Sequence, residues 1–232
     1  MKLAVMQPYL FPYIGYWQLM VAVDKFVVLD DVNFIKKGWI NRNNLLINGQ
    51  AQLFTVPLKE VSQNKLINEI MLSDEEAWKN KFHRTIEMAY KKAPFFSDVA
   101  PLLRNIIDSP EKNCSAYIFN SFNQVLAYLE LKQNFTASSF IYDNRHLKGE
   151  EKITDICLKE KTDQYINPVG GMELYSRDKF REKNIRLNFL KSKPVSYSQF
   201  GNEFVPWLSI IDVLMFNPPE KIRAFLKEYE LL

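Results

Sequence analysis

A polar segment early in the chain concentrates side chains that bind anions and planar rings. It reads Lys36-Lys37-Gly38-Trp39-Ile40-Asn41-Arg42-Asn43. The guanidinium of Arg42 fits a carboxylate or a phosphate as a planar fork, and Lys37 adds a point charge for the same anions. Trp39 offers an apolar face for a sugar or a base, while Asn41 and Asn43 each carry a donor and an acceptor. The segment predicts a binding site for a small anionic ligand, with a solvated basic loop as the alternative.

Two further groups of polar residues follow the first two apolar segments of the chain. The candidate ligand contacts near the first segment are Gln7, Tyr9, Tyr13 and Tyr16. Asp30 and Asp31 follow the second segment, residues 26–29. Ligands of open α/β sheets bind beyond the carboxyl ends of the strands, so we expect both groups at one edge. Adjacent carboxylates point to opposite faces, so one of the two aspartates should reach the site. A turn or a helix cap is the alternative role for them.

Candidate acid–base groups lie further along the chain. His83, inside an expected helix, is suited to proton transfer near neutral pH, or else is a partly buried histidine that only hydrogen-bonds. Late in the chain, Tyr197 and Gln199 precede an apolar segment in which Ser209 and Asp212 share one helix face. The residue types of a Ser-His-Asp triad are present in Ser209, His83 and Asp212, but the serine lacks the glycines of a nucleophile elbow. A hydrogen bond that fixes the helix is the simpler expectation for the serine and the aspartate.

The composition excludes several classes of protein. Of 232 residues, 47% are hydrophobic and 14% aromatic, which is typical of a packed globular chain and not of a disordered one. Lys+Arg 30 against Asp+Glu 27 gives a net charge of +3, too small for the basic field that nucleic-acid binding usually requires. There is no P-loop and no GxGxxG motif, and 7 glycines are few for a phosphate cradle made of backbone. We therefore expect a small-molecule ligand and no nucleic acid.

Cysteine usage and hydropathy indicate the compartment. Cys114 and Cys157 lie far apart without CxxC spacing, and with 2 His and 2 Cys a zinc site would need all four to converge. We predict no metal site and expect reduced, buried thiols, as in a cytosolic protein. The chain starts like a strand rather than a signal peptide, and no apolar run approaches the roughly 20 residues that span a bilayer. These features predict a cytoplasmic protein without membrane insertion.

The N-terminal elements that position these residues form an expected βαβ unit. Residues 2–7 predict an apolar strand, residues 15–23 an apolar helix, and residues 26–29 a β-branched and aromatic strand. Pro8 and Pro12 keep the aromatic segment between strand and helix out of a helix, so an ordered loop is expected there. A βαβ crossover is right-handed and pairs its strands in parallel.

The rest of the chain predicts a hairpin, a helical insertion and a return to strand–helix alternation. Asn48-Gly49 between two apolar segments is a strong hairpin signal. Three helices are expected within about residues 73–132, opening at the capping box Ser73-Asp74-Glu75-Glu76. Strands return near residues 140–142, 164–166 and 185–190, and an amphipathic helix is expected at residues 220–229. We predict one α/β domain over residues 1–232 with a mostly parallel sheet, a β-hairpin and this insertion.

Nearly the whole chain resembles the WbqC-like protein family. The N-terminal pattern that carries the resemblance is Gln7-Pro8-Tyr9, Pro12, Gly15-Tyr16, Asp24-Lys25-Phe26-Val27, Asp30-Asp31-Val32-Asn33-Phe34, Lys37, Trp39 and Asn41-Arg42-Asn43. It continues through Thr55-Val56-Pro57, His83, Tyr90, Tyr197, Gln199, Phe204 and residues 208–212. Asn33 stands where many members have glutamine. The resemblance implies a bacterial protein of surface-polysaccharide (O-antigen) biosynthesis, a glycine transferase role having been suggested for some members, and it marks the motif residues as the site.

A second resemblance concerns the segment Tyr13-Ile14-Gly15-Tyr16. It stands where nucleotidyltransferases and class I synthetases of the HUP type carry their HIGH sequence, at the start of the first helix. In those enzymes imidazoles and a helix N-terminus stabilise a triphosphate. Here tyrosines replace both histidines, so Lys37 and Arg42 would have to supply the positive charge. The resemblance implies a Rossmann-like sheet of the HUP type and, as an alternative function, adenylyl transfer with ATP and Mg²⁺.

The favoured hypothesis is a transferase that moves an acyl or aminoacyl group, with glycyl as the candidate, to an amino sugar or a nucleotide-linked sugar. Lys37 and Arg42 would hold the phosphate or carboxylate of the substrate, and aromatic side chains would pack the sugar or base. Asp30, Asp31 or His83 would accept the amine proton.

The rival hypothesis is a noncatalytic ligand-binding or assembly protein of the same pathway. The favoured mechanism requires early and late segments of the chain to fold toward one shared hollow that contains the cationic and amide groups. Arg42 and Gln199 on opposite outer flanks, facing bulk water, would contradict it.

Overall fold

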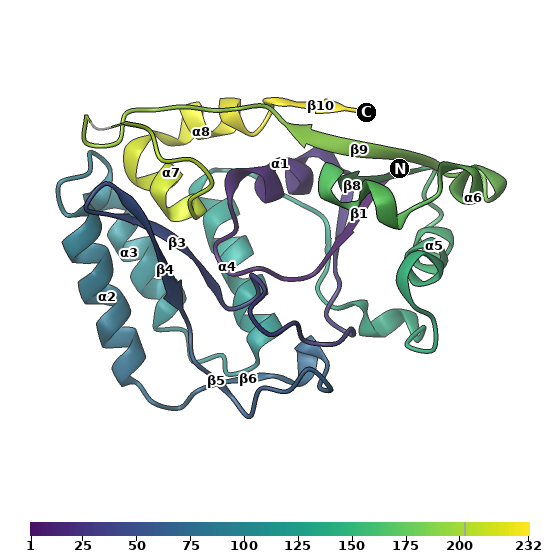
Figure 1. Cartoon of the computed structure of the whole chain (residues 1–232), viewed down its shortest axis with the longest axis horizontal. Coiled ribbons are helices and arrows are strands. Elements are labelled where there is room, and N and C mark those ends of the chain that lie inside the picture. Colours follow the sequence, from purple (N-terminus) through teal and green to yellow (C-terminus); the bar gives the residue numbers. More distant parts are fainter. Residues whose placement is uncertain (202) are drawn as a thin grey trace.

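The computed structural model describes residues 1–201 and 203–232, and in them six strands form one central sheet (Figure 1). In sheet order the strands are β10 (Tyr229–Leu231), β9 (Arg186–Ser192), β8 (Gln164–Pro168), β1 (Lys2–Met6), β2 (Lys25–Val28) and β7 (Phe135–Thr136). All neighbouring strands are parallel except β10, which is antiparallel to β9. The predicted α/β class and mostly parallel sheet are thus confirmed.

Helices cover both faces of this sheet. Leu3 and Val5 of β1 face an apolar cluster that includes α5 (Gly149–Lys159) and α6 (Arg177–Glu182), whereas Ala4 faces the larger cluster on the other side. The larger cluster includes α1 (Ile14–Ala22), α4 (Cys114–Tyr128), α7 (Ile210–Phe216) and α8 (Pro219–Phe225). Successive strand side chains alternate between the faces, so strands buried on both sides have nearly continuous apolar sequences.

The long crossover between β2 and β7 contains the hairpin and the predicted helices. The hairpin, β3 (Arg42–Ile47) and β4 (Gln50–Thr55), is a separate antiparallel sheet. Asn48 (φ 51°) and Gly49 (φ 73°) form its two-residue turn, which fits the Asn-Gly signal. The remaining elements of the crossover are β5 (Leu58–Lys59), η1 (Ile67–Glu69), β6 (Met71–Leu72), α2 (Ala77–Tyr90), α3 (Phe96–Ile107) and α4. Figure 1 shows α2, α3 and α4 on one side of the molecule and α5 and α6 on the other.

Some expected elements differ from the observed ones. Residues 140–142 belong to a 3₁₀ helix, η2 (Ser139–Tyr142), because Ser138 caps its start and Asp143 ends it in a left-handed conformation. The predicted capping box does not form: α2 begins after Glu76 without a side-chain cap, and Ser73 Oγ instead accepts from the backbone N–H of Glu75 at 3.2 Å. The last expected helix ends early at Phe225, and β10 follows it.

A further 3₁₀ helix, η3 (Val169–Leu174), follows β8. Among the described residues no helix combines the length and the apolar character needed to cross a membrane.

Candidate functional site

The loop after β1 is held in place by side chains from distant elements. The backbone carbonyl of Phe11 accepts hydrogen bonds from Asn43 Nδ2 on β3 and from Ser209 Oγ at the start of α7, both at 2.8 Å. The N–H of Leu10 donates to the carbonyl of Ile40 at 3.0 Å. The order of strands reverses at β1, which lies between β2 and β8, and ligands of open α/β sheets bind at such a point. Early and late segments therefore converge at the edge of the sheet where a ligand is expected.

This convergence forms a cavity of about 300 Å³, here called the aromatic cavity. Its lining residues are Tyr9, Pro12, Tyr13, Trp39, Asn43, Asn44 and Trp207. Trp39 is 46% exposed and Trp207 is 70% exposed, so much of both residues is accessible to solvent. A second cavity of about 110 Å³ shares Tyr13 and Trp207 with the first, and the rings of these two residues pack edge to face at 5.8 Å. Aromatic faces with a few amide groups suit a sugar or a base.

Among the described residues, three of the ten non-glycine residues with positive φ lie in the segments that line or flank the aromatic cavity. Phe11 (φ 45°), Lys37 (φ 63°) and Trp207 (φ 61°) have left-handed backbone conformations although none is glycine. Such conformations cost about 1–3 kcal/mol each, and they cluster at functional sites. Burial does not explain the conformation of Trp207, because most of its side chain is exposed. The strain supports a binding role for this residue.

Arg42 lies against a wall of the aromatic cavity. Its Nε donates to the carbonyl of Gly38 at 2.8 Å, and its guanidinium lies 6.0 Å from the ring centroid of Trp39. Within residues 1–201 and 203–232, no carboxylate is within ion-pair distance of this guanidinium. Lys37 is exposed on the same loop. The loop therefore orients one cation and leaves its terminal Nη groups for an anion.

The tyrosines of the first loop have two different roles. Tyr9 and Tyr13 line the aromatic cavity, and burial raises the pKa of both phenols, so they remain protonated donors. Tyr16 is buried in the core, where its hydroxyl donates to the carbonyl of Gln7 at 2.8 Å. Tyr16 and Gln7 therefore support the loop rather than line the cavity. Asn41 is likewise used internally, since its Nδ2 donates to the carbonyl of Val56 at 2.7 Å.

Asp30 and Asp31 are buried behind the edge of the sheet. Asp30 accepts hydrogen bonds from Ser115 Oγ at 2.7 Å and Ser138 Oγ at 2.6 Å, and burial raises the pKa of its carboxyl group. Asp31 accepts from Ser139 Oγ and pairs with the buried Lys152 Nζ at 2.7 Å. Both aspartates are at most 3% exposed. Their oxygens are already bonded within the protein, so this pair does not fit a magnesium ion or a base that meets substrate.

No alternative metal centre is present in the part of the chain that the structure describes. It contains no group of three His, Cys, Asp or Glu side chains that could hold a metal ion.

Asp212 is the centre of a buried hydrogen-bond network. One of its carboxylate oxygens accepts from the Tyr90 hydroxyl at 3.1 Å, and the other from the Tyr197 hydroxyl at 2.7 Å and Gln199 Nε2 at 2.6 Å. Burial raises the pKa of the Asp212 carboxyl group. Gln199 also binds the backbone of Val205, so it is part of this network and does not face the aromatic cavity as expected. The network joins α2 to α7 and to the segment before α7.

His83 and Ser209 do not form a catalytic triad with Asp212. His83 Nε2 lies 2.8 Å from Asp108 Oδ1, on the pair of helices α2 and α3, and does not line the aromatic cavity. Ser209 Oγ donates to the carbonyl of Phe11 and accepts from the N–H of Ile211, as the cap of α7. Asp212 is bonded to tyrosines and glutamine instead of histidine.

The structure thus separates the predicted site residues into two sets. Those at the aromatic cavity or directly beside it are Tyr9, Tyr13, Trp39, Asn43, Lys37 and Arg42. Those used inside the protein or on another surface are Gln7, Tyr16, Asp30, Asp31, Asn41, His83, Tyr197, Gln199, Ser209 and Asp212. Sequence reasoning did not select Asn44 and Trp207. The available signal was Pro206-Trp207, a tryptophan beside a proline just outside an apolar segment.

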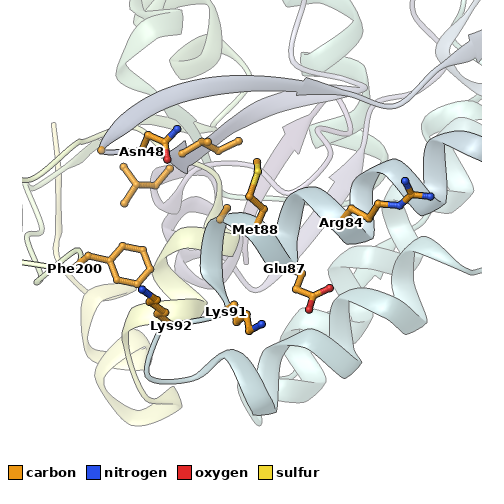
Figure 2. Close-up of a pocket in the computed structure, with 11 residues that line it drawn as sticks. Asn48, Arg84, Glu87, Met88, Lys91, Lys92 and Phe200 are labelled. Atoms are coloured by element: carbon orange, nitrogen blue, oxygen red, sulfur yellow. The ribbon is translucent and has the colours of Figure 1, made fainter.

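A larger cavity of about 750 Å³ lies elsewhere, between the tip of the hairpin and the end of α2 (Figure 2). None of the predicted site residues lines it. Its lining is open and largely exposed.

The fold and the site define an α/β protein with a cavity of small-molecule size at the reversal point of a mostly parallel sheet. A model of the WbqC-like protein family matches residues 7–224, and the chain belongs to this family. A Mycobacterium tuberculosis protein, the uncharacterized protein Rv1507c, is 27% identical to it over 229 residues, which covers 97% of each chain. No solved structure matches the chain. The family match includes all residues of the aromatic cavity.

Proposed function

We propose that the chain binds a sugar that carries a phosphate or another anionic group, with a nucleotide-linked amino sugar as the favoured ligand. The observation that carries this proposal is that Trp39 and Trp207 line one cavity while Arg42 lies over the ring of Trp39. An indole face can stack on a pyranose or a base, and a guanidinium held by Gly38 and Trp39 can bind the anion. The cavity volume of about 300 Å³ suits one ring of such a ligand.

We further propose that the bound sugar is the acceptor of an acyl or aminoacyl group, with glycyl as the candidate. The sugar amine would attack the acyl carbonyl, the new C–N bond would form, and the leaving group would depart with its bonding electrons while the amine loses a proton. The resemblance to proteins of O-antigen gene clusters supports this reaction class. It also supports a bacterial, cytoplasmic setting for the reaction.

The noncatalytic alternative is favoured by one observation. Asp30, Asp31 and His83, the side chains predicted to accept the amine proton, are bonded to other groups away from the aromatic cavity. A transferase built on this cavity would therefore act by orienting the two substrates, and the proton would leave to solvent or to the leaving group.

Adenylyl transfer with ATP and Mg²⁺ remains the other enzymatic candidate. Two observations favour a nucleotide near α1: Tyr13 at the start of this helix lines both cavities, and the cationic Lys193, just after β9, lines the smaller one. The strand order, with β1 between β2 and β8, also supports a Rossmann-like sheet.

A fluorescence titration tests the binding proposal. Trp39 and Trp207 are exposed, whereas Trp17 is fully buried, so a ligand in the cavity should change mainly the emission of the first two indoles. We expect a saturable change with uridine- or thymidine-diphosphate amino sugars that is lost when both Trp39→Phe and Trp207→Phe are present. An unchanged response in that double variant would overturn the assignment of the site.

Mass spectrometry tests the reaction. Incubation of the full chain with ATP, glycine and a nucleotide-linked amino sugar should yield a glycylated sugar if transfer occurs. Binding without any product over this panel, or over preformed acyl donors, would favour the noncatalytic alternative.

A further inference from the structure

Strand β4 is an edge strand whose partner lies on one side only. It pairs with β3 in a two-stranded sheet, over six consecutive residue pairs without a bulge. The outer side of β3 is occupied: the N–H of Leu46 donates to the Tyr90 hydroxyl at 2.8 Å, and the carbonyl of Asn44 accepts from the N–H of Ser209 at 2.9 Å. The hairpin is thus fixed to the rest of the molecule through β3.

The outer side of β4 is open. Leu46 lies opposite Ala51, and Asn44 lies opposite Leu53. Two residues that lie opposite each other in an antiparallel pair of strands either both point their backbone N–H and C=O groups at the partner strand or both point them away from it. The N–H and C=O groups of Ala51 and Leu53 therefore face outward from the hairpin. Among the described residues, no backbone or side-chain group hydrogen-bonds to them there.

Nothing in the sequence of β4 protects this edge. The strand reads Gln50-Ala51-Gln52-Leu53-Phe54-Thr55, with no charged residue and no proline. Edge strands that must not pair usually carry a lysine, a proline or a bulge. An open edge without these features is a template on which an extended segment of another chain can add as a strand.

A groove runs beside this edge, along α2. Three cavities of about 750, 430 and 220 Å³ form it, and each borders the next because they share Met88. Met88 is 69% exposed, Leu53 53% and Phe200 43%, so the groove offers apolar side chains to a partner. Figure 2 shows Met88 rising from α2 toward the hairpin, with Phe200 and Lys92 near the end of the helix.

The charge of the groove indicates the chemistry of its partner. Four exposed cations line it, Lys81, Arg84, Lys91 and Lys92, against the single acid Glu87. A second copy of this chain would bring the same cations against each other, and like charges oppose such pairing. A segment with acidic side chains would be attracted instead.

We propose that β4 and the groove beside α2 bind an extended, acidic segment of a partner protein by strand addition. Backbone hydrogen bonds to Ala51 and Leu53 supply the pairing, and alternate side chains of the segment meet Met88 and the cations of α2. This surface is separate from the aromatic cavity, since the two share no lining residue.

Selection from a random peptide display library against the full chain tests this proposal. We expect enriched peptides to be acidic and rich in β-forming residues. Ala51→Pro removes an outward N–H without removing a hydrogen bond of the hairpin, so it should weaken these peptides at least about tenfold, as measured by fluorescence polarisation. Ala51→Ser keeps the N–H and should bind normally. Circular dichroism and denaturant unfolding confirm that each variant is folded.

A charge-reversal pair gives a second readout that does not depend on the backbone. Lys81→Glu with Arg84→Glu should weaken the same peptides at least about tenfold at low salt, whereas the matched pair Lys132→Glu with Lys227→Glu should not. Enrichment of peptides that bind Ala51→Pro as well as the parent, or no enrichment at all, would overturn the proposal. So would a dimer of the parent that Ala51→Pro abolishes in sedimentation, because the edge would then belong to a second copy.

Discussion

At the scale of single residues, Asp212 has a structural role and not the catalytic role that the residue types of a triad offered. Three buried donors, from Tyr90, Tyr197 and Gln199, meet at its carboxylate. Asp212→Ala would leave these donors unpaired, at about 1–3 kcal/mol each, so we expect a loss of about 3 kcal/mol or more in the free energy of unfolding. Denaturant unfolding measures this loss. A loss below about 1 kcal/mol would contradict the network.

The pH dependence of stability gives an independent check on Asp212. Burial raises the pKa of its carboxyl group in the folded protein above the ordinary value of 3.8, so the folded state holds the proton more tightly than the unfolded state does. The stability contributed by this proton is therefore fully present below pH 3.8 and is lost as the pH rises through the folded-state pKa. Measured against Asp212→Asn at each pH, the parent should be relatively most stable in acid. A relative stability that rises with pH would refute the shift.

Trp207 illustrates the opposite case, a residue in a left-handed conformation for which we propose a binding role. Glycine freely adopts the left-handed backbone conformation that Trp207 has, and the indole of Trp207 is largely exposed. We therefore expect Trp207→Gly to change the free energy of unfolding by less than about 1 kcal/mol. The same change should lower the affinity of a nucleotide-linked sugar about tenfold or more. Paired unfolding and fluorescence measurements separate the two effects. A large loss of stability with intact binding would assign Trp207 a structural role.

At the scale of elements, the Asn48-Gly49 turn sets the register of the hairpin. Gly49 has φ 73°, a conformation in which a Cβ is strained even though no atom lies within 4 Å of its position. We expect Gly49→Ala to destabilise the protein by about 1 kcal/mol. Gly170→Ala is the matched control, because that position is equally open but has no positive φ, and it should be neutral in thermal unfolding. Equal effects at both positions would argue against the turn strain.

Elements could be predicted from sequence where their signals are local. The βαβ start, the hairpin and the helices α2, α3 and α4 follow from apolar patterns, prolines and the Asn-Gly turn. β10 could not, because its three residues form a strand only by pairing with β9. The strand expected at residues 140–142 was wrong because the cap at Ser138 and the left-handed Asp143 override β-forming side chains there.

At the scale of the whole molecule, a buried ion pair joins α5 to the end of β2. Lys152 Nζ lies 2.7 Å from Asp31, and both side chains are almost fully buried. Lys152→Met would leave a buried carboxylate without its partner, so we expect a loss of about 3–5 kcal/mol. Adding Asp31→Asn to Lys152→Met should recover part of the lost stability. Denaturant unfolding of the single and the double variant measures the difference. An unchanged stability of Lys152→Met would contradict this contact.

The same long-range contacts limit what sequence reveals about the site. The residue types of Trp39, Asn43 and Arg42 mark their segment as a candidate site, and the structure places the segment at or beside the aromatic cavity. The burial of Asp31 could not be predicted, because its partner Lys152 lies 121 positions along the chain. Trp207 was missed because its exposure depends on how the segment before α7 crosses the first loop.

Calorimetric titration of a nucleotide-linked amino sugar into the parent, Arg42→Ala and Arg145→Ala tests the central claim most directly. Arg145 is the matched control, since it also lies over an aromatic ring, Phe140, but away from the aromatic cavity. We predict that Arg42→Ala weakens binding at least about tenfold while Arg145→Ala binds like the parent, both variants remaining folded. Equal affinity of the parent and Arg42→Ala for the ligand would contradict the account.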